Sequence, residues 1–430
     1  MNIKNMRLID EFAGVPLCAA LSFLARARHA AGSCQHFHQL QAPKILIIHL
    51  SEMGAFVLAQ PAIQELQRRI PQAELYFLVC SPIDELIQEL NLAPKSRIFT
   101  IKNNNFAGLT ASALRSVYRL RHIGIDAVIN EEGFSRFAAI LSYLSCPRGL
   151  RVGLHPNGLR SLYKGNLETH KVQYNSHIHA SRSYLNLIGA LWADPQDTPL
   201  LKTSLTPSGE IDVTPKAGVC PATWSNYLPL PHTFSYQPSP HSLTKIANSL
   251  QKRGIEPEQE LIIVNPNSSD MVSHRCWPLE NYEIVCRELL RRHPQAAIVV
   301  TGTAQESAGA HYLRTHVDGP IYDFTGDTNI SELLALYTRC RLMITDNSGL
   351  AHLASIVGLP TIVLYGPETP LLFSPLSDKC CQLYANLACS PCISPYSNNK
   401  TACTRCCRCL TSLTPQHVLQ AAEKVWQKDR

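Results

Sequence analysis

Two features in the second half of the chain have the chemistry to bind a diphosphate. Ser348-Gly349 stands directly before a helical segment that begins at Leu350. A glycine-bearing turn that leads into a helix N-terminus offers backbone N–H groups and a positive dipole end to an anion. Arg275 is the second feature, because a guanidinium can hold two phosphate oxygens at once. A lone arginine is more often a surface cation, so the expectation depends on the two features occurring together.

The chain contains no Asp-x-Asp sequence, the usual carboxylate pair that holds a divalent metal on a nucleotide diphosphate. We therefore expect no cofactor for catalysis. Arg275 and helix N-termini would instead stabilise the negative charge of a departing diphosphate.

Alternating strands and helices must position these residues. An apolar run that begins at Lys44 is followed by a helical pattern from Val57 to Arg69, and further strands are expected near 75–79, 98–101 and 127–129. A second series of strands covers 261–264, 297–301, 321–324, 342–345 and 361–364. This alternation predicts an α/β fold of two tandem Rossmann-like domains, each built on a parallel, doubly wound sheet. Ligands would bind beyond the carboxyl ends of the strands, in a cleft that the two domains face.

The domain boundary is expected where the periodicity fails, because prolines crowd a polar stretch between about Ala193 and Pro240. The predicted organisation is an N-terminal amphipathic helix and linker at 1–43, a Rossmann-like domain at 44–200, a Pro-rich linker at 201–255, a second Rossmann-like domain at 256–380, and a Cys-rich segment with a terminal helix at 381–430.

Five blocks of the second half resemble, in order and spacing, the donor-binding half of the family 9 glycosyltransferases, which include ADP-heptose:lipopolysaccharide heptosyltransferases. The blocks are Asn265-Pro266-Asn267-Ser268, Arg275-Cys276-Trp277-Pro278, Gly302 to Glu306, Thr345 to His352 and Leu364 to Pro370. The resemblance runs from about Lys44 to the C-terminal tail and implies a GT-B type fold. It also implies donor-binding roles for Asn265, Asn267, Arg275, Gly302, Glu306, Asp346, Asn347, Ser348, Gly349 and His352.

Two of these roles are specific in the family, and one position departs from its pattern. By the resemblance, Arg275 holds the donor phosphates and Glu306 accepts hydrogen bonds from the ribose hydroxyls. The family more often has an aspartate immediately before the Ser/Thr-Gly pair, whereas this chain has Asp346 followed by Asn347. Asn347 can still hydrogen-bond a sugar or phosphate oxygen but is neutral. The preferred donor could therefore differ from ADP-heptose.

A second departure concerns the activation of the acceptor. The loop after the first strand usually reads Gly-Asp in this family, and its aspartate is the base proposed to deprotonate the acceptor hydroxyl. Here the loop reads Gly54-Ala55, and alanine cannot accept a proton. We expect Glu52 to take this role. The alternative, which the sequence favours equally, is that Glu52 is a solvent-exposed carboxylate of the loop without a catalytic role. The second choice is Glu131 or Glu132, in an acidic loop of the acceptor half.

The expected activity is inverting transfer of a heptose or similar sugar from a nucleotide-diphospho-sugar to a lipopolysaccharide-core or other glycan acceptor, lipid-linked or oligosaccharide. The alternative is a catalytically inactive nucleotide-sugar or glycan-binding protein of the same fold, because Ala55 replaces the usual base. A nucleotide-sugar epimerase shares the two-domain architecture, but the Trp277-Pro278 and Ser348-Gly349 blocks argue against it.

Charge and hydropathy bear on the location of the protein. The net charge of +6 includes no polybasic run, and it does not indicate nucleic acid. No apolar run reaches the roughly 20 residues of a membrane-spanning helix. The apolar segment from Phe12 to Ala31 follows Asp10 and Glu11, which weakens a reading as a signal peptide. It predicts a helix that lies either on the membrane surface or on the main domain. The protein is expected to be cytoplasmic, and a helix on the membrane surface would make it peripheral on the inner membrane.

Six of the sixteen cysteines fall in one C-terminal segment, and the other ten are scattered as in proteins of a reducing cytosol. Cys389 and Cys392, with Cys403 and Cys406, have the spacing of a structural zinc site. Disulfides are the alternative. A second polar cluster is expected to line the acceptor side, with a zinc site as its alternative, and consists of His155, His170, His177 and His179.

Overall fold

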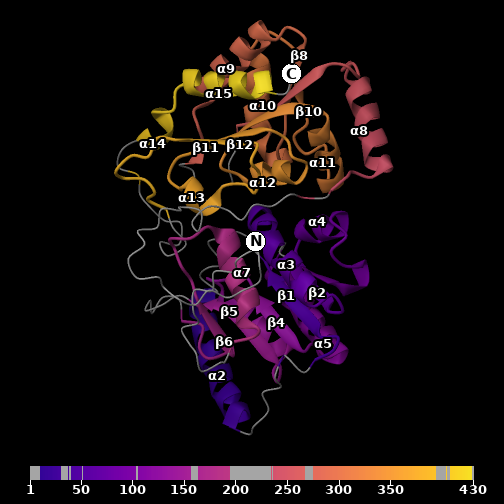
Figure 1. Ribbon diagram of the computed structural model, residues 1–430, viewed down its shortest axis with the longest axis vertical. Coiled ribbons are helices and arrows are strands. Elements are labelled where there is room, and N and C mark those ends of the chain that lie inside the picture. Colours follow the sequence, from indigo (N-terminus) through magenta and orange to yellow (C-terminus); the bar gives the residue numbers. More distant parts are fainter. Residues whose placement is uncertain are drawn as a thin grey trace. The chain divides into compact units, whose positions relative to one another are not determined.

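The computed structural model describes residues 10–30, 37, 40–50, 52–102, 105–155, 163–193, 234, 236–266, 275–393, 403 and 407–428. The chain divides into two compact units, Met1–Leu228 and Pro229–Arg430. Each unit is built on one six-stranded sheet. Figure 1 shows the first unit in indigo to magenta and the second from salmon through orange to yellow.

The first sheet is parallel throughout, in the order β3-β2-β1-β4-β5-β6. Its central strands are apolar and buried on both faces, as in sheets that helices cover on each side. The strand order reverses between β1 and β4, and doubly wound sheets bind ligands at such a switch point. The strands are β1 (Lys44–His49), β2 (Glu74–Cys80), β3 (Ile98–Ile101), β4 (Ala127–Asn130), β5 (Leu150–His155) and β6 (His170–Gln173).

Five helices flank this sheet: α3 (Met53–Arg69), α4 (Ile83–Glu89), α5 (Phe106–Ile123), α6 (Arg136–Ser145) and α7 (Ala180–Ala190). α3 packs against α7, and α5 against α6. Asn105 begins α5 by accepting a hydrogen bond from the N–H of Gly108, and Gly124 ends it in the left-handed conformation at φ 75°. α3 begins at Met53, so that Gly54 and Ala55 lie in its first turn and not in the expected loop.

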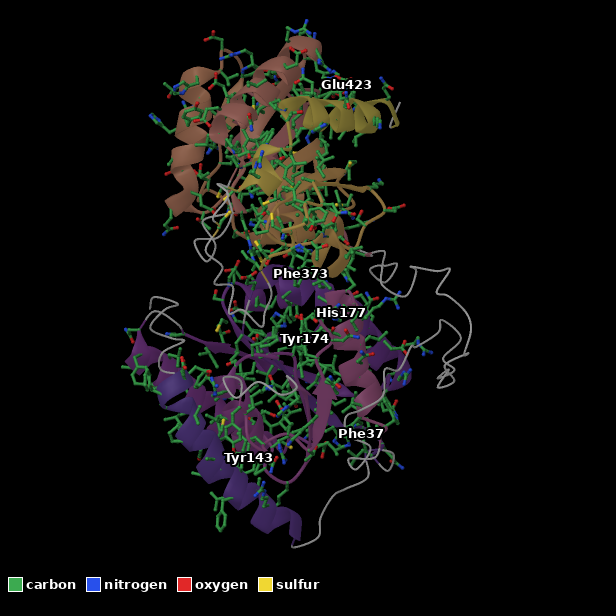
Figure 2. The ribbon with its side chains drawn as sticks, turned by 90° about the vertical axis from the view of Figure 1, so that its left-hand side faces the viewer. Phe37, Tyr143, Tyr174, His177, Phe373 and Glu423 are labelled. Carbon is green, nitrogen blue, oxygen red and sulfur yellow. The ribbon has the colours of Figure 1, made fainter. Side chains whose placement is uncertain are left out.

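The N-terminal helix α2 (Gly14–Ala30) packs against α6. Cys18 and Ala25 are buried together with Tyr143, and Figure 2 shows Tyr143 beside this helix. Asp10 accepts hydrogen bonds from the main-chain N–H groups of Arg136 and Phe137, at 3.3 and 2.8 Å, and so caps the start of α6. Of the two alternatives predicted for this segment, the structure shows packing on the domain. None of the described helices is long and apolar enough to cross a membrane.

The second sheet has the order β12-β11-β10-β7-β8-β9 and is also parallel. Read from the β9 edge, this is the connectivity of the first sheet, with the switch point between β7 and β10. The strands are β7 (Glu260–Asn265), β8 (Ala296–Val300), β9 (Ile321–Asp323), β10 (Cys340–Asp346), β11 (Thr361–Tyr365) and β12 (Cys380–Tyr384).

The helices of the second unit are α8 (Pro240–Lys252), α9 (Leu279–Arg292), α10 (Ser307–His316), α11 (Ile330–Thr338), α12 (Gly349–Ile356), α13 (Pro370–Phe373), α14 (Arg408–Thr411) and α15 (Pro415–Lys428). α9 packs against α10 and α15, and α11 against α8 and α12. Trp277, Leu410 and Trp426 belong to one buried cluster with β7, β8 and β10. The C-terminal helices are therefore part of the core of this unit.

The structure differs from the expected domain limits at two places. Residues 240–252, at the end of the expected linker 201–255, form α8, because Ser239 accepts a hydrogen bond from the N–H of Ser242 and Pro240 occupies the first helical position. The second sheet continues past the expected limit at 380, since β12 pairs with β11 as its sixth strand.

Candidate functional site

The residues expected to bind a donor lie at the carboxyl ends of neighbouring strands in the second sheet. Asn265 ends β7, Asp346 ends the adjacent β10, and Gly302 follows β8. Across the switch point, Nδ2 of Asn265 lies 3.5 Å from Oγ of Ser348. Asn267 is outside the described residues. The strand ends therefore bring together the two blocks that the sequence separates by about 80 positions.

Helix α12 begins at this edge. Ser348 is its N-cap residue and Gly349 its first residue, and the Ser348 hydroxyl makes no capping hydrogen bond to the helix. Main-chain N–H groups of the first turn and the positive end of the helix dipole can therefore receive an anion. His352, one turn further on, is buried, and burial lowers the pKa of its imidazole to about 4. The imidazole is therefore neutral at pH 7.

The Asp346 side chain is buried in the interior and is not exposed at the edge of the sheet. Its side chain is fully buried, and burial raises the pKa of its carboxyl well above the usual value. Oδ1 accepts a hydrogen bond of 3.1 Å from the main-chain N–H of Trp277, and the Trp277 indole donates to the carbonyl of Leu413 at 2.8 Å. Asp346 thus fastens the segment that follows Arg275 to the end of β10.

Arg275 is nine-tenths buried and forms an ion pair with Glu368, in the turn after β11. The other carboxylate oxygen of Glu368 accepts a hydrogen bond of 2.6 Å from the side-chain amide of Asn347. Glu368 lies inside the recognised Leu364 to Pro370 block, but it was not among the site residues predicted from the sequence. An acidic residue in a turn directly after a buried strand was the available signal.

Glu306 lies beyond β8 and is half-buried. Its Oε2 accepts hydrogen bonds from the main-chain N–H and the hydroxyl of Thr303, at 2.6 and 3.0 Å. This is a capping box for the short helical turn that precedes α10. The expected ribose contact of Glu306 stays a prediction.

A second polar group occupies the switch point of the first sheet. Nδ1 of His49, at the end of β1, lies 2.7 Å from Oε2 of Glu131, just after β4, and both side chains are buried. Burial alone would lower the pKa of His49, but the hydrogen bond and charge of Glu131 outweigh it and raise that pKa. Burial raises the pKa of Glu131, against the opposing effect of His49. His49 was not among the site residues predicted from the sequence, although a histidine at the end of a buried apolar strand was a signal for it.

The other two expected carboxylates are more accessible. Glu132 is half-buried, and its Oε1 accepts the main-chain N–H of Leu50 at 2.6 Å. Glu52 is exposed at the N-cap of α3, and its main-chain carbonyl lies 3.3 Å from Nε2 of His49. Burial, followed by the charges of these three acids, raises the pKa of Tyr184 well above its usual value. Glu52, Glu131 and Glu132 therefore do meet at one edge of the sheet.

A buried ion pair supports this edge. Nζ of Lys164 lies 2.9 Å from Oε1 of Glu168, and both side chains are almost fully buried. Lys164 also donates to the carbonyls of Leu154 and Glu132, at 2.9 and 3.1 Å. The same Glu168 oxygen accepts from Nδ2 of Asn130 at 2.9 Å. The network fixes the main chain that carries Glu132.

The Cys-rich segment is only partly described. Cys406 lies outside the described residues, and Cys389 is exposed. The N–H of Cys407 donates to Sγ of Cys403 at 3.2 Å, and burial followed by the neighbouring thiols of Cys403 and Cys389 raises the pKa of Cys392. Within the described part of the chain, no three side chains of Cys, His, Asp or Glu are arranged to hold a metal ion. The zinc site therefore stays a prediction.

Two doubly wound units with this shared strand order are the architecture of GT-B type glycosyltransferases. The fold is similar to that of ADP-heptose lps heptosyltransferase II of E. coli, with a TM-score of 0.65 and 18% identity over 90% of this chain and 100% of that one. It is also similar to a family 9 glycosyl transferase from Veillonella parvula, with a TM-score of 0.66 and 17% identity over 90% of this chain and 97% of that one. At such identities the likeness concerns the fold.

Residues 228–402 match the sequence model of glycosyltransferase family 9 (heptosyltransferase). This match confirms the resemblance seen in the sequence. Lipooligosaccharide heptosyltransferase 2 of Haemophilus influenzae is 28% identical over 198 residues, which are 45% of this chain and 54% of that protein. Lipopolysaccharide heptosyltransferase 2 of Escherichia coli is 28% identical over 107 residues, 24% of this chain and 30% of that protein. The chain thus matches about half, or less, of the length of these relatives.

Proposed function

We propose that this chain is an inverting glycosyltransferase that moves a heptose or similar sugar from a nucleotide-diphospho-sugar to a lipopolysaccharide-core or other glycan acceptor. The supporting observation is the carboxyl edge of the second sheet. There, Arg275 and the start of α12 lie beyond adjacent strands of the region that matches the family 9 model. A guanidinium beside a helix N-terminus whose N-cap side chain is not bonded to it suits a diphosphate.

The same groups would act most strongly on the departing diphosphate. As the sugar leaves, positive charge grows on the sugar and negative charge on the diphosphate. Arg275 and the α12 dipole favour this distribution over the neutral ground-state bond. The direct test is incubation of the full chain with ADP-heptose and other nucleotide sugars in the presence of a core acceptor, with the product detected by mass spectrometry. Product that disappears in Arg275→Ala supports the proposal, and no product with any donor contradicts it.

The base for the acceptor hydroxyl is proposed to be Glu52 or Glu132. Glu131 is a weaker choice, because its carboxylate is buried against His49. A base must reach the proton that it abstracts, and Glu52 and Glu132 are the more exposed of the three. Loss of a base typically costs about 100-fold or more in kcat. Comparison of kcat for Glu52→Gln and Glu132→Gln, with nucleotide affinity measured in parallel, identifies which one acts.

A second candidate function is a nucleotide-sugar or glycan-binding protein without turnover. Ala55 favours it, because this side chain in the first turn of α3 has no group that accepts a proton. The variant Ala55→Asp separates the two functions. Turnover that appears only in this variant would make the natural chain a binder, whereas turnover in the natural chain that Glu52→Gln or Glu132→Gln abolishes supports the enzyme.

The exposed face of α2 is proposed to bring the enzyme to a lipid surface. On α2, Leu17 and Phe23 are 50% and 75% exposed, and Arg26 is also exposed. Apolar side chains bordered by a cation suit the boundary of an anionic membrane. Phe23→Glu should reduce sedimentation with phosphatidylglycerol vesicles, while Phe106→Glu, at an exposed phenylalanine of α5, should not. Equal sedimentation of both variants and the natural chain would contradict this role.

The Cys-rich segment is proposed to be structural, held by zinc or by disulfides. It docks on the turn after β11, where the Ser390 hydroxyl donates to the Gly366 carbonyl at 2.5 Å and the Cys392 N–H to the Pro367 carbonyl at 2.9 Å. Elemental analysis of the full chain and a thiol count after unfolding test this role. Bound zinc, or fewer than the sixteen thiols of the sequence, supports it, and sixteen free thiols without zinc contradict it.

A further inference from the structure

Three side chains from three separate loops meet at the carboxyl edge of the second sheet. Arg275 follows β7, Asn347 follows β10, and Glu368 follows β11. The Arg275 guanidinium pairs with one oxygen of the Glu368 carboxylate, and the Asn347 amide donates to the other oxygen. All three are about nine-tenths buried, so this is a built arrangement of the interior and not a surface ion pair.

Glu368 supplies a carboxylate that the family pattern places at position 347 instead. By the resemblance, the family more often has an aspartate at position 347, directly before Ser348-Gly349, and this chain has an amide there. The neighbouring Asp346 cannot substitute for it, because its carboxylate is fully buried and holds the main chain of Trp277. The Glu368 carboxylate instead lies against the Asn347 amide. Compared with the family pattern, an amide occupies the β10 turn and a carboxylate comes from the β11 turn.

The negative charge of Glu368 stabilises the buried guanidinium of Arg275. A guanidinium without a counter-charge is costly to bury, and a carboxylate that accepts from one of its nitrogens offsets this cost and fixes its plane. The Arg275 Nε atom is buried, and no described residue accepts a hydrogen bond from it. Glu368 therefore occupies only part of the donor fork of Arg275, and at least the Nε donor has no acceptor among the described residues.

Contacts of the two residues before Glu368 fix its position. Gly366 and Pro367 directly precede it, and their carbonyls accept hydrogen bonds from Ser390 and Cys392. Gly366 also packs so closely on Leu410 that a Cβ atom would lie 2.5 Å from Leu410 Cγ. The turn is thus anchored on both sides, and Glu368 can orient Arg275 without moving itself.

We propose that Glu368 is a positioning residue of the donor site, which holds Arg275 toward the diphosphate in place of the carboxylate that the family has at position 347. The inference rests on the proposed function and adds a residue to it. It makes a specific claim, since a carboxylate is needed at one of the two positions, 347 or 368, and an amide at the other.

A charge exchange tests this claim. Calorimetric titration of the full chain with ADP, or with whichever of ADP, GDP and UDP binds most tightly, gives Kd for the natural chain, Glu368→Gln, Asn347→Asp and the double variant. Glu368→Gln should weaken binding about 10- to 100-fold, because Arg275 loses the partner that orients it. Asn347→Asp should also weaken it, because two carboxylates then face each other. The double variant restores one carboxylate and one amide and should bind within about threefold of the natural chain.

The controls separate positioning from folding. Glu423→Gln, a matched change in the same unit at a surface contact with Arg292, should leave Kd unchanged, and Figure 2 shows Glu423 on α15, away from Phe373 of α13. Where Glu368→Gln fails to fold, Glu368→Asp keeps the charge on a shorter arm and should weaken binding while the protein stays folded.

The outcomes distinguish the positioning role of Glu368 from the donor site itself. Natural affinity in Glu368→Gln, or losses that simply add in the double variant, would overturn the positioning role while the donor site stands. No binding of any nucleotide by the natural chain would overturn the proposed function together with this inference.

Discussion

The Nδ1 atom of His49 lies 2.7 Å from the Oε2 atom of Glu131, and neither side chain reaches solvent. Removal of one partner leaves the other buried without its counter-charge, which typically costs about 3–5 kcal/mol. Glu131→Gln should therefore destabilise the first unit by an amount of this order, measured by hydrogen exchange of the β1 and β4 amides in the full chain. Glu65→Gln, which removes a partly exposed partner of Arg68 on α3, should cost no more than about 1 kcal/mol.

The same pair sets a pH dependence. The pKa values of His49 and Glu131 are both raised, so both groups hold protons to higher pH in the folded chain than in the unfolded chain. Stability from these groups is therefore present at low pH and is lost as the pH rises through their folded values. Protection of the β1 amides should fall as the pH rises above 6.5, the ordinary pKa of a histidine, and should change less in Glu131→Gln. Protection that rises with pH would contradict this assignment.

His352 should produce the opposite dependence in the second unit. Its pKa is lowered by burial from 6.5 to about 4, so the unfolded chain binds the proton more tightly. Stability is then present above pH 6.5 and is lost as the pH falls toward 4, by about 3 kcal/mol in all. Urea unfolding of the full chain at pH 7.5 and pH 5 measures the loss. His352→Met should remove most of it, and an unchanged slope in that variant would exclude His352 as the source.

Asp346 should behave as a structural residue. Asp346→Asn keeps an oxygen that accepts from the Trp277 N–H, so nucleotide affinity and stability should change little. Asp346→Ala leaves that buried N–H without an acceptor, which costs about 1–3 kcal/mol. Denaturant midpoints and nucleotide titrations of both variants provide the measurement. A large loss of affinity in Asp346→Asn without a loss of stability would instead indicate direct contact with the donor.

The Lys164–Glu168 pair should show strong non-additivity. Lys164→Met leaves a buried carboxylate behind and should destabilise the first unit by about 3–5 kcal/mol. Adding Glu168→Leu removes that charge, and the double variant should recover most of the stability. Hydrogen exchange of the β4 and β5 amides reports the effect. Losses that add would show that the two charges act independently.

Much of the fold could be predicted from the sequence, because the central strands are continuous apolar runs. β1 and β10 read in this way directly. β6 and β12 did not, since edge strands with polar residues lack that pattern, as in His170-Lys-Val-Gln173. β5 was also missed, because Gly153 interrupts it where the Glu168 side chain packs against the strand.

The candidate site was predictable only where a local motif carried it. Ser348-Gly349 is a local signal, and it does lie at the start of a helix. The His49–Glu131 pair spans 82 positions and the Arg275–Glu368 pair 93. Such pairs depend on which strands are neighbours in the sheet, and the spacing of residues along the chain does not encode this.

Because Leu410 packs directly on Gly366, the last helices are required for the core of the second unit. Leu410, Val418 and Trp426 complete the same buried cluster as Trp277. A protein shortened to end at Ile393 would leave that cluster open to water and should bind hydrophobic dyes and aggregate. The Cys-rich region therefore cannot be removed as an accessory tail, and a search for a minimal soluble fragment of this chain has to keep its C-terminus.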